Sequence, residues 1–376
     1  MVQSTNFPFI CFPNMSLFPA LGKAPAGLRL QRIKRSPNYN GKNFQNLVDT
    51  PVSREDVSMF KMLRELGNRP ANAAPPKPLP NVHTDLQNLP DDQATLVWFG
   101  HSSYLLKINK THILVDPVFS GNASPVSFFA KAFPGSNDYG VKDMPATIEA
   151  VLLTHDHYDH LDYKTILELK TRTNHFYTSL GVGAHLEYWG IEPQRITELD
   201  WWESISFDEA GRPAGSQNGS AGESTAFSLT AAPSRHFSGR GLKRGGAIWS
   251  SFVLETPGYR LFLGGDSGYE QHFKVIGERF GPFDLAILEC GQYNENWPYI
   301  HMMPEQTVQA AGDLRAKTLL PVHWGKFTLA MHPWDEPVRR VTAAAAEAEL
   351  PVTTPKIGEP VIINQHYPNS NWYESL

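Results

Sequence analysis

The sequence is poor in cysteine, in long apolar runs and in net charge, and each shortage narrows what the protein can be. Cys11 and Cys290 are its only two cysteines and lie far apart, so a disulfide is not expected and a thiolate metal site is excluded. No apolar run reaches the ~20 residues that a membrane-spanning helix needs. A net charge of -5 argues against a general nucleic-acid binder. The 41% of hydrophobic residues predicts a soluble globular protein with a large core.

Acidic residues are absent from the first 48 positions, which carry the basic residues Lys23, Arg29, Arg32, Lys34, Arg35 and Lys42. This composition leaves two interpretations open. Residues 1–48 could be a disordered arm. They could instead be an address or an anchor, because organellar presequences are rich in Arg and poor in acids, and a basic patch attracts anionic lipid. The protein is therefore expected inside the cell, either soluble or peripherally bound to a membrane.

The rest of the chain divides into a connecting stretch, a main domain and a tail. Residues 49–93 carry helix start and stop signals at Ser53 and Gly67, then a proline-rich linker that is expected to wrap the domain. Residues 94–365 begin with a β-meander, continue with alternating strands and helices, and then repeat that order. Two such blocks predict two sheets packed together with helices outside. Residues 366–376 are expected to be a tail.

Metal-ligand side chains are most concentrated at residues 154–160, which read Thr-His-Asp-His-Tyr-Asp-His. An apolar run before this turn fits a buried strand, and the periodic segment after it fits a helix. His155 and His157 can reach one ion, while Asp159 and His160 can reach a second. Neutral imidazoles and carboxylates are ligands that zinc prefers. The alternative is a polar loop with surface histidines, so the downstream chain must supply the remaining ligands.

Three further ligand-type residues follow apolar runs downstream, namely His236, Asp266 and His323. In layered α/β folds the loops at strand ends converge on the active site. Each residue alone has an ordinary explanation, as a hydrogen-bonded histidine or a turn aspartate. Their joint occurrence after the clustered turn favours a metal centre.

The string His155-x-His157-x-Asp159-His160, followed by the three downstream residues, resembles the metallo-β-lactamase superfamily of hydrolases. Within it, the chain is similar to the branch that contains N-acyl-phosphatidylethanolamine-hydrolysing phospholipase D. The similarity covers about residues 94–345, and its most specific stretches are 98–102, 116–120, 157–163, 198–203, 265–269, 279–286 and 323–327. Residues 290–298 depart from the branch's pattern and are expected to shape the substrate pocket.

This resemblance implies an α+β fold, the αββα sandwich, with two divalent metal ions between the sheets. Zinc is the usual metal of the branch, and manganese and iron are alternatives. The implied ligands are His155, His157 and His236 for one ion, Asp159, His160 and His323 for the other, and Asp266 for both. A hydroxide shared by the ions would attack phosphorus, with Asp159, Asp266 and His301 as catalytic residues. His301 matches the family position that binds or protonates the phosphate group, although it could also be a packing histidine before a helix.

The function that the resemblance implies is a phosphodiesterase of phospholipase D type. It would convert N-acyl-phosphatidylethanolamine into an N-acylethanolamine and a phosphatidic acid. The alternative is a hydrolase of the same fold for a small phosphorylated or lactone substrate, similar to sugar-phosphate lactonases. A non-catalytic metal-binding scaffold is a weaker alternative, because all the expected ligands are present. A phospholipid or another phosphate-containing molecule is the expected partner, and a homodimer is expected by analogy with the branch.

Five more residues receive roles from their positions. Asp116 closes a strand and is expected to orient an imidazole from behind, or else to be a turn aspartate. His101 is expected to be a buried histidine that helps pack the floor of the site. Arg240, Lys243 and Arg244 lie in a glycine-rich loop just after a predicted ligand. Such cations are ordinarily solvated, but their place suits an anionic substrate.

Overall fold

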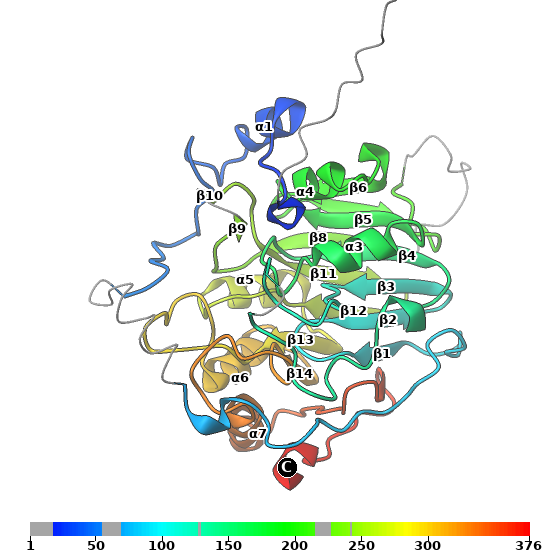
Figure 1. The fold of residues 1–376 in the computed structure, drawn as a ribbon, viewed down its shortest axis with the longest axis vertical. Helices are drawn as coiled ribbons and strands as arrows, with labels where there is room; N and C mark the ends of the chain where they lie inside the picture. The colour runs from blue at the N-terminus through cyan, green and yellow to red at the C-terminus, as the bar shows by residue number, and fades with distance from the viewer. Residues whose placement is uncertain (1–17, 55–68, 127–128, 215–226, 241–242) are drawn as a thin grey trace, which may run out of the picture.

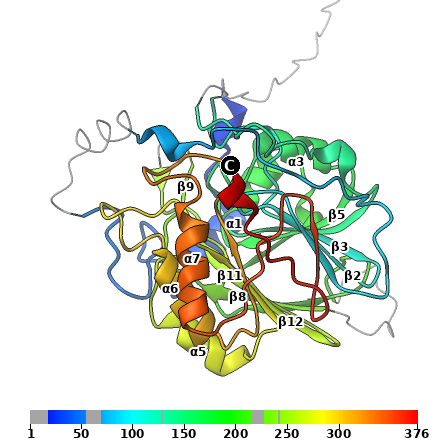
Figure 2. The ribbon, with the colours of Figure 1, turned by 90° about the horizontal axis from the view of Figure 1, so that it is seen from below.

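The computed structural model describes residues 18–54, 69–126, 129–214, 227–240 and 243–376, and two mixed β-sheets form its centre (Figure 1). The sheets pack face to face, with α3 on one outer side and α5, α6 and α7 on the other (Figure 2). The predicted α+β class and αββα sandwich are therefore confirmed. None of the helices in the described ranges has the length and apolarity that crossing a membrane demands.

The first sheet has seven strands, antiparallel from β15 through β3 and parallel from β3 through β6. In spatial order they are β15 (Pro360–Ile362), β1 (Thr95–Trp98), β2 (Tyr104–Ile108), β3 (Thr111–Val115), β4 (Ile148–Leu153), β5 (Thr173–Ser179) and β6 (Ile196–Leu199). Strand β4 is almost entirely buried, as expected for a central strand covered on both faces.

The second sheet has six strands, antiparallel from β7 through β12 and parallel from β12 through β14. In spatial order they are β14 (Leu319–Val322), β13 (Leu285–Glu289), β12 (Tyr259–Leu263), β11 (Ser250–Thr256), β8 (Phe227–Pro233) and β7 (Ser204–Phe207). A separate two-stranded ribbon joins β9 (Gly239–Arg240) to β10 (Lys243–Arg244). The carboxyl ends of β4, β8, β12 and β14 thus carry the predicted ligands.

The helices are α1 (Gly27–Ile33), α3 (Tyr163–Leu169), α4 (Gly183–Tyr188), α5 (His272–Phe280), α6 (Pro304–Asp313) and α7 (Glu336–Glu347), with 3-10 turns η1 (Pro19–Leu21), η2 (Ala71–Ala73), η3 (Val141–Asp143), η4 (Pro193–Arg195) and η5 (Trp372–Ser375). Helices α3, α4, α5 and α6 each connect two parallel strands, whereas α1 precedes the sheets and α7 links β14 to β15. Helix α3 begins where it does because the Asp162 side chain caps it, accepting from Lys164 N and Thr165 Oγ1. That cap closes the clustered turn on its downstream side.

Most regular elements of the main domain lie where the sequence pattern predicts them, but β6, β7, β9 and β10 were not predicted. All four are short and lie in polar stretches, so their periodicity is weak. The predicted helix between Ser53 and Gly67 falls mostly outside the described residues. The proline-rich stretch does wrap the domain, and it buries Leu79 and Leu86 in the main core.

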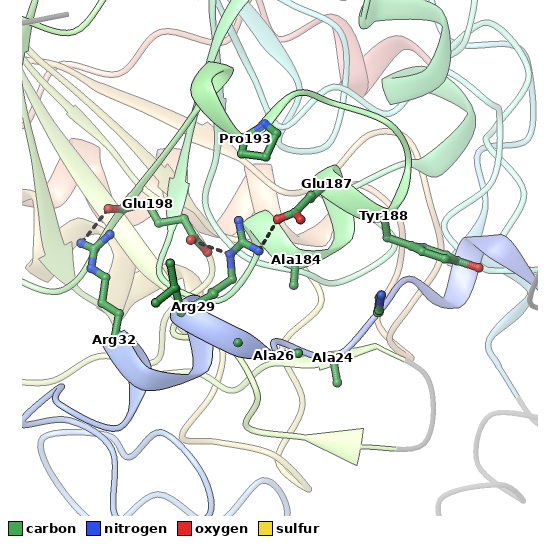
Figure 3. A pocket seen from close by; sticks show the side chains of 12 residues that line it. Ala24, Ala26, Arg29, Arg32, Ala184, Glu187, Tyr188, Pro193 and Glu198 are labelled. Carbon is green, nitrogen blue, oxygen red and sulfur yellow. Dashed lines mark hydrogen bonds and ion pairs between the residues drawn. The ribbon is translucent and has the colours of Figure 1, made fainter. Parts of the chain in front are cut away.

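Residues 18–48 lie along the domain, so the expectation of a disordered arm is wrong for this range. Ile33 and Phe44 are buried in a cluster with Leu180, Trp201, Ile248 and Trp249. Arg29 bridges Glu187 and Glu198 beside an open cavity of about 680 Å³ between α1 and α4 (Figure 3). We call residues 18–50 the N-terminal segment. Residues 1–17 lie outside the described part of the chain.

The last residues of the chain are part of the core and do not form a tail. Trp372 and Tyr373 are buried, and the Trp372 ring stacks on Trp324 with centroids 5.4 Å apart. Trp324 follows His323, the first residue after β14, so the chain end packs behind one strand of the site. The predicted boundary at residue 365 was set by the last apolar run, which ends before these aromatic residues.

Candidate metal centre

The clustered turn leaves β4 as a tight bend in which two backbone amides donate to one carbonyl. His160 N and Leu161 N both donate to His157 O, at 3.1 and 2.8 Å. The second sheet approaches this turn closely, since Ser250 N donates to Thr154 O at 3.1 Å. Gly265 permits the approach, because a Cβ there would lie only 2.7 Å from the Ser250 carbonyl oxygen. The two sheets therefore bring their ligand-bearing ends together.

Three imidazoles converge from the turn and from the end of β8, and we call His155, His157 and His236 the first ligand group. His157 Nδ1 lies 3.0 Å from His155 Nε2 and 3.1 Å from His236 Nε2. Asp266 Oδ2 lies 3.7 Å from the Nε2 atoms of both His155 and His236. These four side chains form a cluster that could hold a metal ion.

Asp159, His160 and His323 make up the second ligand group on the other side of Asp266. Asp266 Oδ1 lies 3.1 Å from His160 Nε2 and 3.2 Å from His323 Nδ1. Asp159 Oδ2 lies 3.6 Å from His160 Nε2. Asp266 thus turns one carboxylate oxygen toward each ligand group. The structure brings together all seven predicted ligands, which lie up to 168 positions apart in the sequence.

The donor set suits a divalent metal ion. Within the described ranges, His160 Nε2 and Asp266 Oδ1 are buried and have no hydrogen-bond partner, as expected of atoms that face an ion. Burial lowers the pKa of His155, His236 and His323 well below the ordinary value, which keeps these imidazoles neutral. Burial alone would raise the pKa of Asp266, but His160 and His323 hold it well below the ordinary value. Neutral imidazoles and ionised carboxylates are the forms that bind metal.

The second ligand group is held from behind by buried side chains of the first sheet. Asp116 Oδ2 accepts from His160 Nδ1 at 2.7 Å and from Thr154 Oγ1 at 2.6 Å. His101 Nε2 donates to Asp159 Oδ2 at 2.9 Å. Asp116 therefore lies where the sequence places it, behind an imidazole, and His101 has the more specific contact of orienting a carboxylate.

Three residues around this same group hold strained backbone conformations. His101, Asp116 and His323 have φ values of 53°, 41° and 69°, in the left-handed region that such residues rarely adopt. His101 and His323 also hold each other, since His323 N donates to His101 O at 3.0 Å. Strain of this kind costs about 1–3 kcal/mol per residue and is characteristic of functional sites.

The first ligand group is held partly by the N-terminal segment. Asn46 Oδ1 accepts from His236 N at 3.1 Å, and Asn46 Nδ2 donates to His236 O at 2.8 Å. The imidazole itself donates from Nδ1 to Ile300 O at 2.8 Å. Sequence reasoning missed Asn46, which lies 190 positions from its partner and resembles any other polar residue of its segment.

His301 lies over both ligand groups and is paired with a carboxylate that sequence reasoning missed. Its ring centroid is 5.1 Å from that of His236 and 5.3 Å from that of His323. His301 Nδ1 donates to Glu289 Oε2 at 2.7 Å. Burial alone would lower the pKa of His301, but Glu289 raises it above its ordinary value. Glu289 follows the apolar run of β13, so the strand-end pattern that found Asp266 also applies to it.

The predicted substrate-binding cations lie in different environments. Arg240 is buried and donates to the carbonyls of Ala20, Asp156 and Leu161, so it fastens the N-terminal segment to the clustered turn. Its substrate role stays a prediction. The Lys243 side chain lies outside the described part of the chain. Arg244 is exposed at a cavity of about 320 Å³ that His157 and Asp159 also line.

Comparisons with known proteins agree with this geometry. Residues 111–324 match the Beta-lactamase superfamily domain. The uncharacterized protein Mb0930 of Mycobacterium bovis is 38% identical over 347 residues, which cover 91% of this chain and 88% of that protein. N-acyl-phosphatidylethanolamine-hydrolyzing phospholipase D 1 of Caenorhabditis elegans is 29% identical over 242 residues, covering 62% of this chain and 64% of that protein.

A solved structure shows the same fold. Igni18, a metallo hydrolase from the archaeon Ignicoccus hospitalis, superposes with a TM-score of 0.54 at 20% identity. The superposition covers 73% of this chain and 100% of that one. Because the matched domain spans more than half of the sequence and contains or borders every ligand described above, the chain belongs to the β-lactamase superfamily and is a metal-dependent hydrolase of it.

Proposed function

We propose that this hydrolase is a phosphodiesterase of phospholipase D type, which cleaves N-acyl-phosphatidylethanolamine into an N-acylethanolamine and a phosphatidic acid. The observation that carries the proposal is the position of His301 over both ligand groups, where it suits a phosphate held at the centre. The similarity to the phospholipase of Caenorhabditis elegans supports the choice of substrate.

Each ligand group would hold one divalent ion, and Asp266, which turns one oxygen toward each group, would serve both. Imidazole and carboxylate donors suit zinc, and iron or manganese are alternatives. Bound there, such ions would lower the pKa of a water molecule and neutralise charge on the phosphoryl oxygens. His101 and Asp116 fix Asp159 and His160 in the orientation that this binding requires.

The reaction makes one bond at phosphorus and breaks one. The oxygen of a water molecule bonds to phosphorus, and the bond from phosphorus to the oxygen of the N-acylethanolamine breaks. His301 carries a proton on each ring nitrogen and donates the one that Glu289 does not hold to the departing alkoxide. The attacking water gives up one proton to solvent as its oxygen bonds to phosphorus, and a proton from solvent then reloads His301. Arg244, exposed beside His157, attracts the anionic phosphate group to the centre.

A membrane surface rich in anionic lipid is the proposed source of the substrate. Phe18, Leu28 and Leu47 of the N-terminal segment are 60%, 83% and 55% exposed, which is unusual for large apolar side chains. Lys34 and Arg35 are exposed on the same segment, which has no acidic residue before Asp49. Apolar side chains beside basic ones suit peripheral binding to anionic lipid.

A small phosphorylated or lactone substrate is the second candidate. The cavity beside the ligands, about 320 Å³, is modest in size and partly polar, which favours a small molecule over a long acyl chain. A sugar-phosphate lactonase would use the same ligands.

Product analysis by mass spectrometry separates these candidates. The zinc-loaded protein is incubated with a synthetic N-acyl phospholipid and, separately, with a phosphorylated sugar lactone. We expect the first to give N-acylethanolamine and phosphatidic acid, with His301→Ala slowing the reaction by about 100-fold or more, the scale of general acid catalysis. His366→Ala, at an exposed histidine outside the centre, is the matched control. Turnover of the lactone alone would contradict the phospholipase proposal.

A further inference from the structure

Glu289 is almost fully buried beside the metal centre, at 1% exposure, yet no step of the reaction described above assigns it a role. It ends β13, whose register places it next to Val322 of β14, one residue before the ligand His323. Its carboxylate lies within the cluster that also contains Asp266, His301 and His323. A buried carboxylate is costly unless it is hydrogen-bonded, so its contacts indicate its purpose.

Both oxygens of this carboxylate are already engaged by the protein. Oε2 accepts from His301 Nδ1 at 2.7 Å. Oε1 accepts from Met302 N at 2.9 Å and from Ser267 N at 3.2 Å. The two amides flank other residues of the centre, because Ser267 follows Asp266 and Met302 follows His301. These contacts satisfy the carboxylate without a metal ion, which argues against Glu289 as an eighth ligand.

The hydrogen bond at Nδ1 determines which nitrogen of the His301 ring is available to the centre. Because Nδ1 donates to Glu289, a proton stays on Nδ1, and Nε2 is the nitrogen left for a substrate. A ring without this partner can flip or exchange tautomers. The backbone of Glu289 also contacts α6, since its carbonyl oxygen accepts from Thr307 Oγ1 at 2.8 Å.

We propose that Glu289 is a positioning residue that fixes the tautomer and orientation of His301. The proposal rests on the proposed function only in that His301 acts on the substrate. It predicts that the loss caused by a Glu289 substitution passes entirely through His301.

The decisive variant is Glu289→Gln. Its amide oxygen can accept from the two backbone amides, which leaves the NH₂ group facing His301 Nδ1. A donor at that position forces Nδ1 to accept, so Nδ1 loses its proton and only Nε2–H remains. In the zinc-loaded full chain with ¹⁵N-labelled histidine, we expect the His301 Nδ1 signal to change from the protonated to the unprotonated pattern. Metal content should stay that of the wild type.

Kinetics supply the second readout, with N-acyl phospholipid as substrate. We expect Glu289→Gln to lower kcat by about 10- to 100-fold, the usual cost of losing an orienting partner. In the double variant, Glu289→Gln should lower kcat by less than about 2-fold relative to His301→Ala alone, because without the His301 ring Glu289 has nothing left to position. Glu198→Gln is the matched control: Glu198 is also buried and accepts from two backbone amides, but it lies beside Arg29, outside the centre.

Three results would overturn the proposal. Loss of zinc in Glu289→Gln would make Glu289 a ligand. Losses that multiply in the double variant would make its role structural, and an unchanged His301 tautomer would remove the mechanism. If Glu289→Gln does not fold, Glu289→Asp serves instead, because it keeps the charge but withdraws it from Nδ1, and loss of zinc or losses that multiply in the double variant would then overturn the proposal. A wild type that does not cleave the phospholipid defeats the proposed function, yet the tautomer measurement still decides the role of Glu289.

Discussion

The two ligand groups of the centre are built differently, although they share Asp266. The second group is backed by Asp116 and His101, which are completely buried in the first sheet and hold strained backbone conformations. The first group depends on Asn46, contributed by a segment that lies outside both sheets. The second group is therefore formed by the packing of the core itself. The first is complete only when the N-terminal segment is in place.

This comparison predicts that substituting Asp266, the ligand shared by both groups, lowers metal content and turnover more than any other single change. Asp266→Ala should remove metal from both groups and lower turnover by more than the about 10–100-fold that an outer hydrogen-bond partner costs. Metal analysis of the purified protein together with steady-state kinetics provides the test. Asp138→Ala, at an exposed aspartate, is the control. Retention of one full equivalent of metal would show that the groups are more independent than their geometry indicates.

Asp116→Asn should separate the groups. The variant weakens the hydrogen bond that orients His160, so metal affinity at the second group should fall by about 10–100-fold. The first group should keep most of its affinity, since His236 is held by Asn46 and Ile300. Titration with a competing chelator would show two affinities where the wild type shows closer ones. Equal weakening of both sites would contradict the comparison.

The difference between the groups also explains how much the sequence could reveal. The ligands were predictable, because each follows an apolar run and the turn at 154–160 concentrates them. The two sheets were predictable for the same reason, since buried strands leave strong apolar patterns. Asp116 could be placed because it closes such a strand.

Contacts that depend on where distant backbones meet were not predictable. Asn46 and Arg240 act through backbone carbonyls and amides, which every residue has, so no side-chain pattern marks their partners. The position of Arg240 in its loop predicts a substrate cation, but it does not show which carbonyls the side chain contacts. Glu289 could have been found by the strand-end pattern, but that pattern does not tell a ligand from a residue that holds one.

Asn46→Ala should produce the opposite asymmetry to Asp116→Asn. It removes two hydrogen bonds to the backbone of His236, which costs about 1–3 kcal/mol because buried backbone groups lose partners. Metal affinity at the first group should fall, with a smaller loss at the second. The control is Asn40→Ala, since Asn40 lies on the same segment but accepts only from its neighbours Lys42 and Asn43. If Asn46→Ala lowers metal affinity at the first group no more than Asn40→Ala does, the role assigned to Asn46 is wrong.

Arg29→Met should have the smallest effect and tests whether the N-terminal segment acts as one unit. Arg29 pairs with Glu187 and Glu198 at 2.7 Å each, and because Glu187 is 47% exposed, that first pair stabilises by no more than about 1 kcal/mol (Figure 3). If the segment holds together through Ile33 and Phe44, loosening its far end should speed metal release from the first group only slightly. High salt should not slow metal release in either protein. It should reduce the difference in release rate between variant and wild type, because salt screens the ion pairs that only the wild type has. A difference that persists at high salt would mean that Arg29 acts through the packing of its stem, and the first group would then depend on the segment through apolar contacts alone.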